Sequence, residues 1–429
     1  MTTTATRTTR ADRSTAATAR STGAARLHLR RSLGRTAFPF LLVLVVLNTL
    51  LRPMGWRYEP MWAVYQYNFT VMLLGPLLAG VAAWEGHRLA RAAPFLSAHH
   101  RPLAMLAAAW AALLAWCCAA FLLGLVLVLG LVARTGALAA LGPPELLTPL
   151  PALALLGLAC AVGLAAGRLS GEGGKVAAPL AAIVVFLVFL LLYSGELSEF
   201  VMVGGATSSL VGLRPKAGTQ TAQIAFYAAA TLLVLIAAAW STALHHLRPR
   251  QFLAAAATAV LCVLSAGHLA SADPLYLEAR PGDVRCQGTR PEICLGRGYA
   301  TYEPRLRAKL TPLVTAMAEL DLPAPAAFRQ DALRSGRNTG QLSPDTVTGG
   351  DSELLLDMFL GTYYGSDCAI EPGTPMERHH VNARYWLAAA VGAPAYEDPL
   401  LDPRLTSGSP AERIAVARAA FQGLAACDG

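Results

Sequence analysis

The chain has 429 residues, of which 55% are hydrophobic and only 14% are charged. Soluble globular domains carry roughly 45–50% apolar and 25% charged residues, so this composition excludes an ordinary soluble protein. Residues 1–272 hold 20 Lys and Arg against seven acids, whereas residues 273–429 hold 15 against 20. Because the positive charge lies beside apolar stretches and not in a soluble basic domain, nucleic-acid binding is not expected.

The apolar residues are concentrated between residues 37 and 271, which form the predicted membrane domain. A helix needs roughly 20 apolar residues to cross about 30 Å of hydrocarbon, and seven stretches meet this requirement. A signal peptide is an alternative for the first stretch, but no small-x-small cleavage motif follows it, which favours an uncleaved span. The predicted spans are residues 36–51, 61–84, 103–133, 149–167, 176–193, 224–244 and 252–270.

Residues 1–36 are rich in Thr, Ala, Ser and Arg, a composition that predicts a disordered basic tail with an interfacial helix possible from about residue 24 to 35.

The arginine distribution predicts the orientation of the spans. With the N-terminus in the cytoplasm, 15 Lys and Arg lie on the cytoplasmic side and five on the other. The chain has only three lysines and is rich in arginine and alanine, a composition that suggests a GC-rich bacterial genome. We therefore expect a multi-pass protein of a bacterial plasma membrane, with residues 272–429 as an extracytoplasmic domain.

Four of the eight cysteines lie in this C-terminal segment, namely Cys286, Cys294, Cys368 and Cys427. An even set in an oxidising compartment favours disulfides, and three pairings are possible. The expected bonds are Cys286 with Cys294, which closes a short loop, and Cys368 with Cys427, which ties down the C-terminus. Zinc binding is the alternative, but the Cys-x7-Cys spacing lacks the tight knuckle of most structural zinc sites.

Helical periodicity in residues 303–320, and further helical segments near 351–363, 375–391 and 409–426, predict a small, mainly helical C-terminal domain. The fold class expected is thus an all-α polytopic membrane protein. Between the fifth and sixth spans, the run Phe200-Val201-Met202-Val203 is too short to cross a bilayer but is apolar enough to rest on its surface.

Few residues carry recognisable chemistry. Glu377 and His380 are spaced to share one helix face and are weak candidates for a metal site, although a second copy of the motif is absent from the sequence. The segment from Gly171 to Val176 lacks the glycine spacing and the Ser or Thr of a Walker A loop. We therefore predict no catalytic residues, no cofactor and no ATPase within the chain itself.

The stretch from Met72 to Arg88, which contains Gly-Pro-Leu-Leu-Ala, precedes a basic segment ending at Pro94 and a long alanine-rich span. Residues 24–270 with this pattern resemble actinobacterial membrane proteins of the ABC-2 permease type. The resemblance implies that residues 85–102 form a coupling segment, in which Arg88, Arg91 and Arg101 contact a separate cytoplasmic ATPase. It also implies a dimer that exports a peptide, a lipid or an antibiotic-like compound.

The family usually has six spans, whereas this chain adds a seventh span and a C-terminal domain. This departure leaves a second expectation open, a non-transporting membrane anchor or sensor whose extracytoplasmic domain binds a ligand. A third, a metal-dependent hydrolase built on Glu377 and His380, requires a metal ion in the C-terminal domain.

Overall fold

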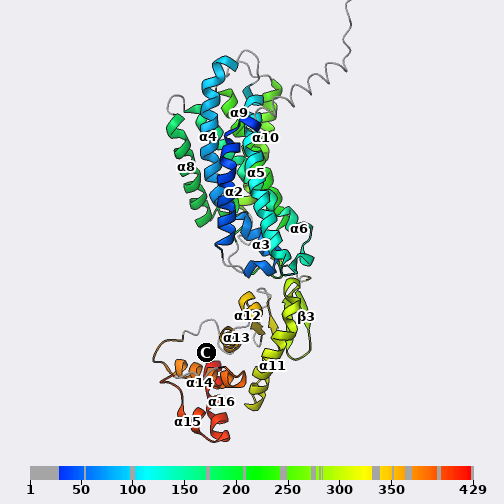
Figure 1. Ribbon diagram of the computed structural model, residues 1–429, viewed down its shortest axis with the longest axis vertical. Helices are drawn as coiled ribbons and strands as arrows, with labels where there is room; N and C mark the ends of the chain where they lie inside the picture. The colour runs from blue at the N-terminus through cyan, green and yellow to red at the C-terminus, as the bar shows by residue number, and fades with distance from the viewer. Residues whose placement is uncertain are drawn as a thin grey trace, which may run out of the picture.

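The computed structural model describes residues 29–52, 55–96, 102–170, 174–205, 209–241, 249–271, 277–279, 282, 284–330, 339–349, 352–362, 370–393 and 398–426. Figure 1 shows a bundle of long helices with a smaller, mixed domain at one end. The chain enters the bundle at the opposite end. The residues described contain seven helical segments that are long and apolar enough to cross a membrane, which confirms the number predicted.

The elements of the bundle are α2 (Leu33–Leu50), η1 (Gly55–Tyr58), α3 (Pro60–Asn68), α4 (Val71–Leu96), α5 (Pro102–Ala133), η2 (Ala137–Ala140), α6 (Pro143–Leu147), α7 (Pro149–Leu169), α8 (Gly174–Ser194), η4 (Ser198–Phe200), α9 (Ala217–Trp240) and α10 (Pro249–Ala270). The predicted second span is divided between α3 and α4. The other six predicted spans each overlap one helix.

Small residues let the two central helices, α4 and α7, pack backbone to backbone. A Cβ atom at Gly163 or Gly167 of α7 would clash with the carbonyl oxygens of Ala79 and Ala83 on α4, respectively. Gly86 of α4 is equally close to the backbone of α7 at Leu164. In a bilayer, helix association depends on such close packing because lipid tails are as apolar as the helices.

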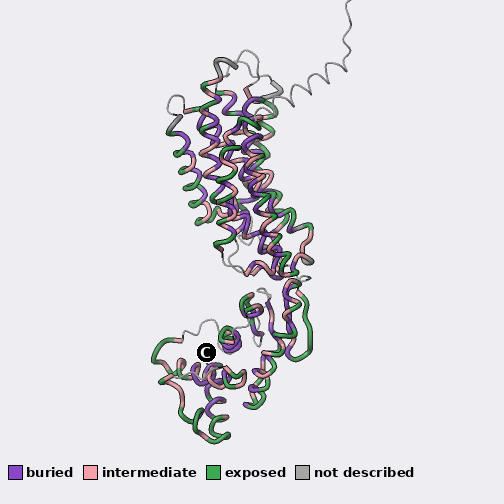
Figure 2. Tube along the Cα trace, in the orientation of Figure 1, coloured by how far each residue is buried: buried purple, intermediate pink, exposed green. Residues whose placement is uncertain are grey.

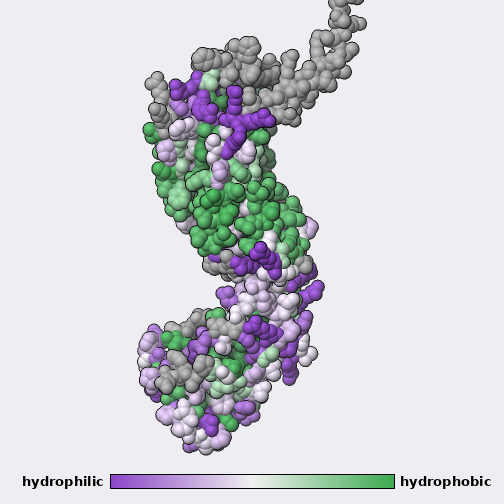
Figure 3. All heavy atoms as spheres, in the orientation of Figure 1, coloured by the Kyte–Doolittle hydropathy of each residue, from purple (hydrophilic) through white to green (hydrophobic). Residues whose placement is uncertain are grey.

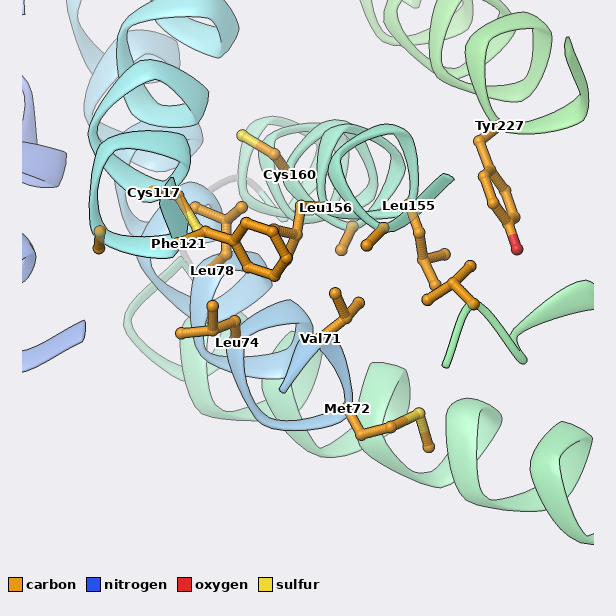
Figure 4. Close-up of a cluster of buried hydrophobic side chains, with 14 of the residues drawn as sticks. Val71, Met72, Leu74, Leu78, Cys117, Phe121, Leu155, Leu156, Cys160 and Tyr227 are labelled. Carbon is orange, nitrogen blue, oxygen red and sulfur yellow. The ribbon is translucent and has the colours of Figure 1, made fainter. Parts of the chain in front are cut away.

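The bundle core is apolar, and large side chains from several helices meet around α4. Figure 4 shows Leu74 and Leu78 of α4 beside Phe121 of α5 and Leu156 of α7, all of them buried. By contrast, α8 and α10 expose long rows of Leu, Val, Ile and Phe on the outside of the bundle. Figure 3 shows, on the face of the bundle toward the viewer, a hydrophobic band with hydrophilic side chains at both ends, as a bilayer requires.

The C-terminal domain contains both strands and helices. Its elements are β2 (Leu277–Ala279), β3 (Val284–Gln287), β4 (Glu292–Gly296), η6 (Arg297–Tyr302), α11 (Glu303–Glu319), β5 (Ala327–Arg329), β6 (Thr339–Gln341), α12 (Pro344–Thr348), α13 (Ser352–Leu360), α14 (Pro375–Ala390), α15 (Pro403–Ser407) and α16 (Pro410–Ala425). The sheet order is β3-β4-β5-β6, with β3 antiparallel to β4 and the other pairs parallel. The described part of the domain is mainly helical, as predicted, but the expectation that the whole chain is all-α was wrong because of this sheet.

Local sequence accounts for the helix starts in this domain. Thr374, Asp402 and Ser409 are N-caps whose side chains accept backbone hydrogen bonds, and each is followed by proline at the first helical position. At α16 the side chains of Ser409 and Glu412 form a capping box. The buried faces of α11, α13, α14 and α16 enclose one core, which Figure 2 shows as a buried interior separate from that of the bundle.

Two backbone contacts join the domain to the bundle. A short strand, β1 (Leu213–Pro215), precedes α9 and pairs antiparallel with β2, which follows α10. At Gly298 of η6, a Cβ atom would clash with the carbonyl oxygen of Tyr58 in η1, so the two backbones touch. The domain is thus attached by packed contacts as well as by the chain itself.

Candidate functional site

The second span is interrupted at the end of the bundle that carries the C-terminal domain. Helix α3 ends at Asn68, and α4 begins at Val71. The buried Asn68 amide donates hydrogen bonds to the carbonyl oxygens of Thr148 (2.8 Å) and Val203 (3.0 Å). The Asn48 amide of α2 donates to the Thr70 hydroxyl at 2.9 Å. The break is a two-residue turn in which the Phe69 and Thr70 amides still donate to the carbonyl oxygens of Gln66 and Tyr67, and the polar side chains attach it to the neighbouring segments.

Residues 198–205, named here the inserted segment, fill the space beside this break. The side chains of Val201 and Val203 are buried in the bundle core. Gln223 of α9 donates to the carbonyl oxygens of Glu199 (2.8 Å) and Met202 (3.1 Å). This run therefore does not rest on the membrane surface, as its sequence allowed, because the neighbouring helices supply the hydrogen bonds that its irregular backbone needs.

Glycine permits the inserted segment to approach α3. A Cβ atom at Gly204 would clash with the carbonyl oxygen of Tyr65, and Gly205 has a φ angle of 116°. The Gly205 amide donates to the same Tyr65 oxygen at 3.2 Å. A larger residue at position 204 would force the segment away from the broken span.

A buried carboxylate, Glu59, lies just before α3 and connects three parts of the chain. It accepts hydrogen bonds from the hydroxyls of Ser209 (2.6 Å) and Tyr299 (2.7 Å) and from the amide of Leu210 (2.9 Å). These four residues are named here the junction site. Ser209 and Leu210 follow the inserted segment, and Tyr299 belongs to the C-terminal domain.

Burial and hydrogen bonding act in opposite directions on the carboxyl group of Glu59. Burial raises the pKa of Glu59 above its ordinary value, and the hydrogen bonds from Ser209, Tyr299 and Leu210 oppose this rise. Burial also raises the pKa of Tyr299, with the charge of Glu59 adding to the effect, so its hydroxyl stays a donor. The three donors to Glu59 are neutral groups, which satisfy its oxygens without neutralising a charge.

A cavity of about 50 Å³ adjoins the junction site. It is lined by the η1–α3 region, by residues 210–212, by residues 296–299 and by Glu145 of α6. Glu145 is buried and accepts a hydrogen bond from the Gly142 amide at 2.8 Å. The cavity therefore opens between the bundle and the C-terminal domain, with two buried acids in its walls.

The cysteines expected to pair are only partly within the described residues. Cys286 and Cys294 are directly opposite each other on β3 and β4, with their sulfur atoms 2.10 Å apart as a disulfide. Cys368 and Cys427 lie outside the described residues. Among the described residues, one cluster has three potential metal ligands: Cys286, Glu292 and Cys294, whose ligand atoms lie within 4.8 Å of one another. The disulfide bond occupies both of its sulfur atoms.

Glu377 and His380, the residues predicted as metal candidates, both belong to α14. The carboxylate of Glu377 accepts a hydrogen bond from the Gly373 amide at 2.7 Å, next to the helix N-cap Thr374. His380 is half-buried, and burial lowers the pKa of its imidazole, while the charge of Asp357 opposes that effect. Within the described residues, neither Glu377 nor His380 belongs to a group of three potential metal ligands.

The arginines expected to contact an ATPase lie at the far end of the bundle. Arg88 of α4 forms an ion pair with Glu85 at 3.1 Å and keeps 48% of its side chain exposed. Arg91, one turn further along, is exposed. Arg101 lies outside the described residues. Two arginines of the segment therefore project from the end of α4 opposite the C-terminal domain.

Sequence reasoning did not find the junction site. Glu59 is one acid in the connection after the first span, and its partner Tyr299 is 240 positions away. The inserted segment did carry a signal, because the stretch from Phe200 to Leu213 has no charged residue and contains Gly204-Gly205. Comparisons with protein-family models, curated proteins and solved structures found no match for this chain.

Proposed function

We propose that this protein is the membrane-spanning subunit of an ABC-2-like transporter that works with a separate ATPase. The observation that carries the proposal is the break in the second span between α3 and α4. The inserted segment packs against this break at one end of the bundle, where the Asn68 amide donates to the Val203 carbonyl oxygen. Discontinuous helices and irregular backbone packed inside a bundle are a common basis of substrate sites in transporters. The chain's lack of a Walker A sequence agrees with an ATPase supplied by another subunit.

Under this proposal the N-terminal end of the bundle faces the cytoplasm, and the C-terminal domain lies outside it. The excess of Lys and Arg on the N-terminal side supports that orientation. Arg88 and Arg91 would then contact the ATPase at the end of α4. The junction site, at the opposite end, would couple the C-terminal domain to the closure of the broken span.

The experiment compares ATPase association with the wild-type chain and with an Arg88→Ala, Arg91→Ala double variant, both tagged and purified from the native host in mild detergent. Loss of the two exposed charges should reduce the bound ATPase at least fivefold without reducing membrane insertion. Arg134→Ala is the matched control. Arg134 is also exposed, but it directly follows the C-terminal end of α5, at the end of the bundle remote from Arg88 and Arg91. Equal ATPase recovery from all three proteins would remove the coupling role of these arginines.

A second function, a non-transporting sensor, is favoured by the hydrogen bond between Glu59 and Tyr299. Ligand binding to the C-terminal domain would reach the bundle through this buried contact. If the purified chain carries no ATPase but a cell-envelope ligand changes hydrogen exchange at residues 209–213, the sensor function replaces the transporter function.

A further inference from the structure

A groove opens toward the lipid-facing side of the bundle, in the half remote from the C-terminal domain. It has a volume of about 480 Å³ and lies among the first turns of α2, the middle of α4 and the first turns of α8. Figure 1 shows these three helices as neighbours along one side of the bundle. Its walls include Leu33, Phe40, Leu77, Trp84 and Ala178.

Small residues make the floor of this groove. Gly80 of α4 approaches α8 so closely that an added Cβ atom would be 3.2 Å from the carbonyl oxygen of Ala178 and 3.3 Å from the Cβ atom of Ala182. The groove therefore has a packed floor and large apolar walls, with Phe40 59% and Trp84 50% exposed. An apolar groove that is open within the hydrophobic band is accessible to the acyl chains of the surrounding lipid.

Two arginines lie beyond the lining residues of α4, on the side where lipid headgroups would be: Arg88, which is paired with Glu85 at 3.1 Å and remains 48% exposed, and Arg91, which is exposed. The lining positions of α4, namely Leu77, Val81 and Trp84, continue along the same helix face to Arg88 and Arg91. Trp84 is placed as an interfacial anchor, because amphipathic rings settle at headgroup depth. Basic residues at the mouth of a pocket between membrane helices attract anionic lipid headgroups.

We propose that the α2–α4–α8 groove binds one anionic phospholipid, with an acyl chain along Leu33, Phe40 and Leu77 and the phosphate beside Arg88 and Arg91. Apolar contact along the groove retains the lipid, and the two arginines select for negative charge. The site requires that the bundle be embedded in a bilayer, and it shares Arg88 and Arg91 with the proposed ATPase contact, but lipid binding itself does not depend on an ATPase partner or on transport.

The test uses the full-length chain, purified in mild detergent, delipidated, and mixed with either phosphatidylglycerol or phosphatidylcholine. Native mass spectrometry then counts the retained lipids. We expect one tightly retained phosphatidylglycerol per chain and at least fivefold lower retention of phosphatidylcholine. Equal retention of the two lipids by the wild-type chain would overturn the proposal.

Thr36→Trp places a large ring in the groove at an exposed lining position and should reduce phosphatidylglycerol retention at least fivefold. Val263→Trp is the control, because Val263 is 70% exposed on the outer face of α10. The same retention by both variants would overturn the acyl-chain position. Thr36→Trp should leave ATPase association unchanged, which separates lipid binding from the proposed coupling at the same end.

The arginines are tested separately, so the proposal remains testable if Thr36→Trp fails to fold. Replacing Arg88 and Arg91 with Gln should abolish the preference for phosphatidylglycerol, and replacing both with Lys should restore most of it. A preference that survives the Gln replacements would show that other groups bind the phosphate, contrary to the proposal.

Discussion

The hydroxyl of Tyr299, in the C-terminal domain, donates a 2.7 Å hydrogen bond to the carboxylate of Glu59 at the start of α3. Both side chains are buried, and Tyr58, the neighbour of Glu59, packs its ring 5.5 Å from that of Tyr299. The contact connects the domain to the same region of the bundle as the broken span and the inserted segment.

Tyr299→Phe removes the hydroxyl that connects the domain to Glu59. Because a hydrogen bond to a charged or strongly polar group contributes about 1.5–3 kcal/mol, we expect a stability loss of that size. It is measured by thermal unfolding of the detergent-solubilised protein. Tyr385→Phe, on α14 of the same domain, is the control. A Tyr299→Phe protein that melts with the wild type would contradict the coupling role.

The strength of the junction should depend on pH through Glu59. Burial raises its pKa above the ordinary 4.5, so the docked state binds a proton more tightly than the separated state. The stabilisation of the docked state that comes from protonated Glu59 is therefore complete below the ordinary pKa of the carboxyl group. It is lost as pH rises through the raised pKa of the docked state. Hydrogen exchange at residues 209–213 and 296–299, corrected for intrinsic rates, should accelerate as pH rises.

Glu59→Gln supplies the control for this pH dependence, because an amide of similar shape does not titrate. Exchange at the same residues should then be independent of pH after correction. A wild-type profile identical to that of the variant would exclude Glu59 as the titrating group.

Gly167→Ala should destabilise the bundle because the added methyl group would clash with the Ala83 carbonyl oxygen on α4. Overpacking of this kind costs about 1–3 kcal/mol. Gly130→Ala in α5 is the matched control, since nothing lies within 4 Å of its added Cβ atom. Melting temperatures of the two variants should differ, with Gly130→Ala at or above the wild type; equal destabilisation would refute the close α4–α7 packing.

Cys286 and Cys294 should be protected from alkylation in the denatured, unreduced protein and should each react after reduction. Replacing both with Ser should cost about 2–3 kcal/mol, toward the lower end for disulfides because the closed loop is short. Peptide mass spectrometry measures the alkylation. Free thiols at both positions, together with bound zinc, would instead support the alternative of a metal site.

Sequence patterning was sufficient for features that are local. Seven apolar runs predict seven helices because each must satisfy its own backbone within the membrane. The helix cap at Ser409 is a local feature of the same kind, since the serine, proline and glutamate of the motif lie within four consecutive residues. The four-stranded sheet was missed because its strands have three to five residues, too few to establish an alternating pattern.

Features that depend on contacts between residues far apart in the chain could not be predicted from the sequence. The broken span at Asn68 is stabilised by carbonyl oxygens of Thr148 and Val203, 80 and 135 positions further along the chain. The junction at Glu59 likewise depends on Tyr299, and one acid near a span end has the same local sequence whether it is buried or solvated. Periodicity and composition carry no information about such pairs.

The most direct test of the account is to identify, by quantitative mass spectrometry, the proteins that remain bound to the intact tagged chain after purification from its own membranes. The transporter proposal predicts an ATPase with Walker motifs in a fixed ratio to the chain, retained when ATP hydrolysis is blocked. Recovery of the chain without any such ATPase, in detergent that leaves the bundle folded, would contradict it.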